Sequence, residues 1–138
     1  MFRTTMIAAA FGLLASPALA ADVAGLWQTP TNGGQVEISH CGNSLCGKLV
    51  NSNHIRENPA LKDVKNKDES QRVRTLKGLQ MLYDFSGGPT KWKDGKVYNP
   101  DDGGTYSGTI ELIGENQLKL KGCIVAPFCK TQVWTRLR

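Results

Sequence analysis

The stretch GTYSGTIELIGENQLKLKGCIVAPFCKTQVWTRLR, residues 104–138, decides the fold class of this chain. In its first two segments the apolar residues Ile110, Leu112, Leu118 and Leu120 alternate with polar ones. Alternation with a period of two is typical of strands that bury one face and expose the other. The turns between the segments are too short to hold a helix, so neighbouring strands pair antiparallel. The stretch therefore predicts a β-meander.

The phase of the last strand follows from the same pattern. Val133 and Leu137 are its clearest aliphatic residues, and they lie an even number of positions apart. Side chains two positions apart share a face of a strand. This phase directs Val133 and Leu137 into the core and turns Trp134 and Arg136 outward.

The chain before the meander contains further strand-like segments. Residues 35–40 and 45–50 flank a turn at residues 41–44, and residues 78–85 form the strongest single strand. In that strand the alternation places Leu79, Met81, Tyr83 and Phe85 on one face, with Leu82 on the other. These segments extend the sheet toward the N-terminus.

Residues 91–98 contain the dipeptide Asp94-Gly95, which is a strong signal for a two-residue hairpin turn. With this hairpin the chain holds eight or nine short strands. Many short strands in up-and-down order favour closure, which removes exposed sheet edges. We expect an all-β fold, a small antiparallel up-and-down β-barrel of about eight strands. A two-sheet sandwich is the alternative.

The long loop, residues 51–77, interrupts this pattern with seven basic and four acidic residues. Asn58-Pro59 is a signal for the start of one helical turn. A connection this long in a small β domain is either mobile or functional. In the functional interpretation, Arg72 and Arg74 form an anion-binding rim.

The first twenty residues have the features of a cleaved export signal. Arg3 precedes an apolar run at residues 6–15, and Ala18-Leu19-Ala20 matches a cleavage site. We expect residues 1–20 to be removed and residues 21–138 to form one β-barrel domain in the bacterial periplasm. No later stretch is apolar enough for a transmembrane segment. The net charge of +5 is mild, and the chain lacks an Arg-rich patch for nucleic acid.

The cysteines Cys41, Cys46, Cys123 and Cys129 all follow the signal. An even number of cysteines in an oxidising compartment indicates disulfides. Of the three connectivities, local pairing of Cys41 with Cys46 and of Cys123 with Cys129 is the first choice. A zinc site made of four thiolates is the alternative, although the spacings are loose for it.

The sequence contains no recognisable catalytic constellation. His40 and His54 are the two imidazoles, and no G-x-S-x-G motif accompanies them. Asp101-Asp102 stands between Pro100 and two glycines, which is the composition of a turn. We expect no enzyme activity, no metal site and no cofactor.

Short motifs distributed over most of the chain resemble a known family. They are Gly25-Leu26-Trp27-Gln28-Thr29-Pro30, Cys41-Gly42, Leu45-Cys46-Gly47-Lys48, Asp63 with Asn66, Arg72-Val73-Arg74, Val97-Tyr98-Asn99-Pro100, Gly104-Thr105-Tyr106-Ser107-Gly108 and Trp134-Thr135-Arg136. As a set they resemble an uncharacterised family of exported bacterial proteins, domain of unknown function 2147. The resemblance implies a lipocalin-like β-barrel and supplies no activity and no catalytic residues.

The Gly25-x-Trp27 start and Arg136 near the end are also similar to the lipocalin and avidin pattern. That resemblance implies that Trp27 packs beneath Arg136 at the base of the barrel. Both residues would then be structural, closing the barrel through a cation–π contact and backbone contacts.

The leading hypothesis is a monomeric, non-enzymatic binding protein with a small apolar or amphipathic ligand inside the barrel. A barrel of this size either fills its interior with side chains or holds one small ligand. The alternative is an envelope protein-interaction module with a filled barrel and a surface patch around Trp92 and the long loop. The candidate ligand-binding residues are Arg72, Arg74, Met81, Tyr83, Trp92, Tyr98 and Tyr106.

Overall fold

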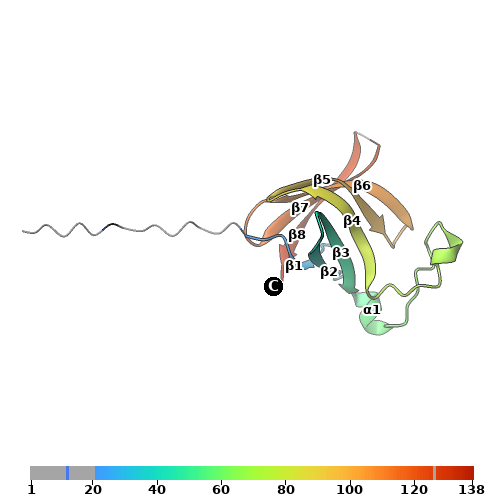
Figure 1. The fold of residues 1–138 in the computed structure, drawn as a ribbon. Helices are drawn as coiled ribbons and strands as arrows, with labels where there is room; N and C mark the ends of the chain where they lie inside the picture. The colour runs from blue at the N-terminus through green and yellow to red at the C-terminus, as the bar shows by residue number, and fades with distance from the viewer. Residues whose placement is uncertain (1–11, 13–20, 126) are drawn as a thin grey trace, which may run out of the picture.

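The computed structural model describes Gly12, residues 21–125 and residues 127–138. The predicted signal peptide lies outside these residues except for Gly12. The described chain forms eight strands and two short helical segments (Figure 1). They are β1 (Gly25–Gln28), β2 (Gln35–Cys41), β3 (Ser44–Asn51), α1 (Asn53–Glu57), η1 (Glu69–Gln71), β4 (Leu79–Gly87), β5 (Lys91–Asn99), β6 (Gly104–Leu112), β7 (Gln117–Val125) and β8 (Phe128–Arg136).

Each strand pairs antiparallel with the next, and β1 pairs with β8, so the sheet is a closed barrel. The prediction of an all-β, up-and-down barrel is therefore confirmed. Within the described residues, no helix is both long and apolar enough to cross a membrane.

The barrel closes where Trp27 of β1 lies opposite Arg136 of β8. The Arg136 guanidinium carbon is 4.4 Å from the centroid of the Trp27 ring. Arg136 also donates hydrogen bonds to the backbone oxygens of Ala24 at 2.9 Å, of Glu115 at 2.8 Å, and of Asp22. These bonds hold the segment before β1 across this end, which we call the closed end.

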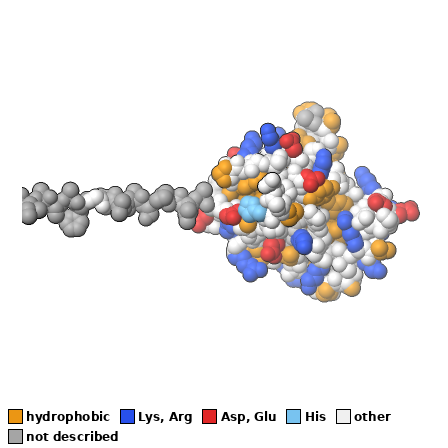
Figure 2. Space-filling view, viewed as in Figure 1, with side chains coloured by type: hydrophobic (Ala, Val, Ile, Leu, Met, Phe, Trp, Pro, Cys, Tyr) orange, Lys and Arg blue, Asp and Glu red, His pale blue; other side chains and the backbone are white. Residues whose placement is uncertain are grey.

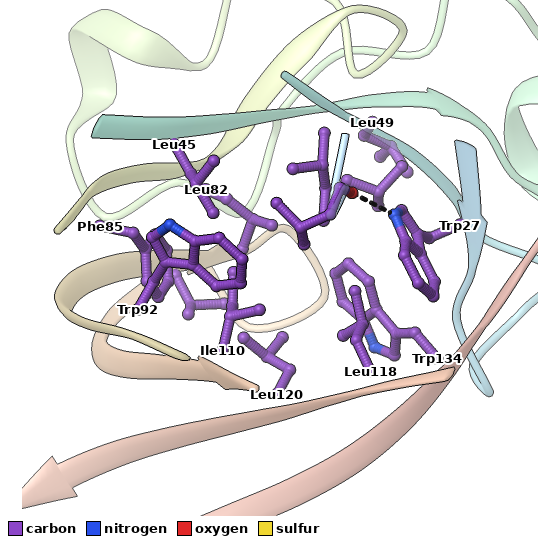
Figure 3. Close-up of a cluster of buried hydrophobic side chains, with 14 of the residues drawn as sticks. Trp27, Leu45, Leu49, Leu82, Phe85, Trp92, Ile110, Leu118, Leu120 and Trp134 are labelled. Carbon is purple, nitrogen blue, oxygen red and sulfur yellow. Dashed lines mark hydrogen bonds between the residues drawn. The ribbon is translucent and has the colours of Figure 1, made fainter. Parts of the chain in front are cut away.

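The closed half of the barrel is filled with apolar side chains that point toward one another (Figure 3). Trp27 donates from its indole nitrogen to the Val23 oxygen at 2.9 Å, and both residues have no exposed surface. The other large members of this core are Ile38, Leu45, Leu82, Phe85, Trp92, Ile110, Leu118 and Trp134. These large side chains lie toward the closed end, and the same cluster continues toward the opposite end through Leu49, Tyr98 and Leu120.

The predicted phase of the last strand is wrong. Trp134 is 1% exposed, whereas Val133 is 45% and Leu137 is 44% exposed. Trp134 lies opposite Leu118, which is also buried, and the large indole fills space that a valine would leave empty. Closure of the barrel therefore requires the phase of β8 in which Trp134 points inward.

The predicted hairpin at Asp94-Gly95 is also wrong, because β5 runs through it without reversing. The pairing of β5 with β6 shifts by one residue between Trp92 and Gly95, and Asp94 has a φ of 58°. The dipeptide is therefore a β-bulge. A Cβ atom at Gly95 would overlap the Phe85 ring, so the glycine allows this ring to lie against the strand.

Strand β4 departs from simple alternation. Its pairing with β3 is interrupted twice, and Asp84 has a φ of 62°. As a result Leu82 is buried and belongs to the core, although alternation assigned it to the opposite face. Met81 and Tyr83 are only partly buried.

The long loop is hydrogen-bonded to itself and to the barrel. Its helix α1 begins one residue after Ser52, whose hydroxyl accepts from the Ile55 amide at 3.1 Å. The predicted helix start at Asn58 is wrong, because Asn58 ends this helix instead. An isolated bridge pairs Lys62 with Thr75 and closes the middle of the loop.

Both predicted disulfides are confirmed. Cys41–Cys46 ties the tip of the β2–β3 hairpin, and Cys123–Cys129 joins β7 to β8. Because all four sulfurs are bonded in pairs, the alternative of a zinc site is wrong.

Candidate ligand-binding cavity

A cavity of about 570 Å³ occupies the end of the barrel opposite the closed end. We call this end the open end. Residues from the turns and strand ends here line the cavity: Thr29, Thr31, Asn32, Gly34, Leu49, Ser52, His54, Leu76, Met81, Val97, Tyr98, Asn99, Pro100, Asp101, Asp102, Tyr106, Leu120, Gly122, Ile124, Phe128, Cys129, Lys130, Gln132 and Trp134. The cavity therefore lies above the packed core.

The inner wall of the cavity is mainly apolar. Leu49, Leu120 and Trp134 are 6%, 5% and 1% exposed and line it from three strands. The Trp134 indole nitrogen donates to the Gln132 side-chain oxygen at 3.0 Å, so this polar edge already has a partner. The wall offers contact surface to an apolar group.

Three of the predicted ligand-binding residues line the cavity together, namely Met81, Tyr98 and Tyr106. Tyr83 is not among the lining residues. Trp92 is 5% exposed and lies in the core of the closed half, so the expectation that it marks a pocket mouth or a surface patch is wrong. The physical reason is the bulge at Asp94-Gly95, which keeps β5 in the barrel wall with Trp92 directed inward.

Arg72 and Arg74 also lie outside the cavity lining and bind other residues of the long loop. Arg72 donates from Nε to the Asn66 backbone oxygen at 2.7 Å. Arg74 donates from Nε to the Asp63 carboxylate at 3.0 Å, and its guanidinium lies 5.1 Å from the Tyr98 ring centroid. The structure thus gives both arginines internal partners.

Asp63 is the centre of these contacts. It is 1% exposed and accepts hydrogen bonds from the Tyr98 hydroxyl at 2.5 Å and from the Asn66 amide at 2.9 Å, besides Arg74. Tyr98 belongs to the cavity wall, so this network fastens the long loop to the open end. The sequence analysis named Asp63 with Asn66 as a motif but assigned neither residue a structural role.

The rim of the cavity is polar and carries both signs of charge. The Tyr106 hydroxyl donates to the Asp102 carboxylate at 2.5 Å, and this hydrogen bond raises the pKa of Tyr106. The other Asp102 oxygen accepts from the Gly104 amide at 2.8 Å. Asp101 and Lys130 are exposed at the rim. Sequence reasoning missed Lys130 and the apolar Leu120, although the alternation in β7 already placed Leu120 on the inner face.

Comparison with known proteins decides the family. Residues 25–136 match the model of the family described as "Uncharacterized protein conserved in bacteria (DUF2147)". The chain belongs to the DUF2147 family. No curated protein matches the sequence.

The DUF2147 chain is also similar to a solved structure, that of protein HP1028 from Helicobacter pylori, which is described as belonging to the lipocalin family. The two are 25% identical, with a TM-score of 0.76, over 86% of this chain and 85% of the other. The DUF2147 barrel is therefore lipocalin-like, as the motifs around Trp27 and Arg136 implied.

The two histidines of the DUF2147 barrel lie at opposite ends. His40 is 2.8 Å from Asp22 at the closed end, whereas His54 lines the cavity. A catalytic site that uses both imidazoles is therefore not formed. The described residues also contain no group of three or more His, Cys, Asp or Glu side chains placed to hold a metal ion.

Tyr98 makes the DUF2147 barrel sensitive to alkaline pH. Burial raises its pKa to about 12, and the hydrogen bond to Asp63 acts in the same direction. An unfolded tyrosine ionises near pH 10, so between about pH 10 and 12 the unfolded chain loses a proton that the folded chain keeps. The free energy of unfolding should therefore fall as the pH rises through this window, by at most about 1.4 kcal/mol per pH unit.

Urea unfolding of the wild type and of Tyr98→Phe across this window measures the effect. We expect the variant to start less stable, since Asp63 loses one donor, and to depend less steeply on pH. If the free energy of unfolding depends equally on pH in the two proteins, Tyr98 has the same pKa in the folded and the unfolded chain.

Proposed function

We propose that this protein is an exported, non-enzymatic binding protein that holds one small apolar or amphipathic ligand in the open end of its barrel. The observation that carries the proposal is the cavity of about 570 Å³ above a filled core. Its size lies within the range of about 300–1,000 Å³ that is usual for small-molecule sites. The two disulfides support export to an oxidising compartment, the periplasm.

The residues of the cavity wall indicate where the apolar and the polar parts of a ligand would lie. Leu49, Leu120 and Trp134 would contact an apolar chain or ring. Among the described residues, every buried side-chain nitrogen and oxygen already has a hydrogen-bond partner. The inner wall is mainly apolar, so polar recognition is expected from rim residues such as Lys130 and Asp101.

The fold supports the same conclusion. Barrels of about eight strands have an interior that is either filled or just large enough for one small ligand. The filled-barrel alternative, with a protein-binding patch around Trp92 and the long loop, has less support. The open end holds a cavity, and Trp92 is buried.

A substitution at Gly122 tests the proposal directly. Gly122 lines the cavity, its φ is not positive, and a Cβ there would meet only the Tyr106 Cβ, at 3.9 Å. Gly122→Phe should therefore fold and fill the cavity with its ring. Gly114 at the closed end has open space around its Cβ position, so Gly114→Phe is the matched control.

Binding of the fluorescent probe 1-anilinonaphthalene-8-sulfonate, followed by titration, is the first readout. We expect Gly122→Phe to weaken probe binding about tenfold or more, because its ring takes up space and covers apolar wall that the probe would contact, and Gly114→Phe to leave it unchanged. Native mass spectrometry of the periplasmic protein should show an extra mass that Gly122→Phe lacks. Equal probe binding by all three proteins, with no extra mass, would contradict the proposal.

A further inference from the structure

The tip of the β7–β8 hairpin exposes large apolar side chains. Ile124 is 77%, Val125 is 61% and Phe128 is 71% exposed. The hairpin projects beyond the barrel wall (Figure 1), and hydrophobic atoms are visible on this projection (Figure 2). A cluster of exposed apolar residues on a projecting element marks an interaction site.

The hairpin tip is continuous with the cavity. Ile124 and Phe128 are exposed and at the same time line the mouth. The Cys123–Cys129 disulfide joins the two strands directly beneath them. A partner that covers the tip would therefore also meet the mouth of the cavity.

Two lysines lie near the base of the apolar tip, and the long loop carries further basic residues. Lys130 lies opposite Gly122 and Lys121 opposite Thr131, one and two pairs below the disulfide. The long loop exposes Val64 and Val73 among seven basic and four acidic residues. One acidic residue, Asp63, is buried, and the rim adds Asp101 and Asp102. The loop thus adds two more exposed apolar side chains and a net positive charge.

We propose that the open end docks on the surface of an anionic lipid bilayer, with Ile124, Val125 and Phe128 inserted among the acyl chains. Apolar side chains with lysines at their base match the depth profile of a bilayer, in which anionic headgroups lie above hydrocarbon. The exposed apolar side chains lie on two separate segments, the hairpin and the long loop. A fluid bilayer can accept both, whereas a protein partner would need a surface of matching shape. The inference goes beyond the proposed function, because docking requires no ligand in the cavity.

Vesicle flotation tests the docking. The probes are vesicles of phosphatidylcholine alone and vesicles in which phosphatidylglycerol replaces part of it. We expect the wild type to float with the anionic vesicles, and to float less at high salt because salt screens the lysines. The double variant Ile124→Ser with Phe128→Ser should bind about tenfold more weakly or worse, because it removes the inserted surface.

The matched control is Ile113→Ser with Val133→Ser, which changes two side chains that are 46% and 45% exposed elsewhere on the barrel. It should float like the wild type. Thermal unfolding should be similar for both double variants, since none of the four side chains is buried. Gly122→Phe should also float normally, so loss of ligand binding and loss of docking are separable.

Two results would overturn the inference. The first is a wild type that stays in solution with anionic vesicles, or a tip variant that floats as well as the control. The second is a change of oligomeric state in light scattering, with a dimeric wild type and a monomeric tip variant. The tip would then be covered by a second copy of this chain.

Discussion

Asp63→Ala is expected to lower the free energy of unfolding by about 3 kcal/mol, because it removes the acceptor for Tyr98, Asn66 and Arg74 at once. This loss is near the lower limit for breaking a buried ion pair. The Arg74 side chain is 35% exposed, so its charge can be solvated after Asp63 is removed. Urea unfolding followed by tryptophan fluorescence measures the change.

The same substitution should release the long loop before the barrel unfolds. Hydrogen exchange at residues 61–77 should accelerate in Asp63→Ala, whereas exchange in β6 and β7 should change little. Asp68→Ala is the matched control, since Asp68 is an exposed carboxylate of the same loop that bonds only to Ser70. If both variants unfold alike, the Asp63 network does not hold the loop.

Trp27→Ala is expected to lower the free energy of unfolding by about 3–5 kcal/mol, the usual cost of deleting a buried aromatic side chain. Trp27 has no exposed surface, and its ring contacts the Arg136 guanidinium where β1 pairs with β8 and closes the barrel. Opening this pairing would expose two strand edges, so the loss should appear in the whole unfolding transition.

Trp27→Phe separates the effect of the aromatic contact with Arg136 from the effect of lost side-chain volume. It keeps an aromatic face beneath Arg136 and loses the hydrogen bond to Val23, so its destabilisation should be the smaller of the two. Urea unfolding monitored by circular dichroism compares both variants with the wild type. An alanine variant as stable as the phenylalanine variant would show that closure does not depend on this ring.

The fold was predictable where a strand has one clear polar face. Ile110, Leu118 and Leu120 alternate with polar residues and are buried as expected. In β8 both faces carry bulky apolar residues, so periodicity alone does not choose between Val133 and Trp134. The choice depends on pairing with β7 and β1, which lie elsewhere in the sequence.

Local signals failed where a distant contact overrides them. Asp94-Gly95 has the composition of a tight turn, yet the Phe85 ring of the adjacent strand lies against Gly95 and keeps the chain extended. No pattern within residues 91–98 contains this information. It arises only when β4 and β5 pair.

The cavity was predictable in part. Tyr98 and Tyr106 were selected as residues that could line the interior of a small barrel, and both line the cavity. The arginines were selected by their charge and by their spacing of two residues. Arg74 has its partner Asp63 eleven residues away, and Asp63 has Tyr98 thirty-five residues away, so their pairing is a property of the folded loop.

The hydrogen bonds between the first strand and the C-terminal residues determine where the protein can be tagged. The Leu26 amide donates to the Arg138 oxygen at 2.8 Å, and the Leu137 amide donates to the Leu26 oxygen at 2.7 Å. Residue 138 therefore lies at the closed end (Figure 1), opposite the mouth. A tag fused after Arg138 would immobilise the barrel on a sensor chip with its mouth facing the flow.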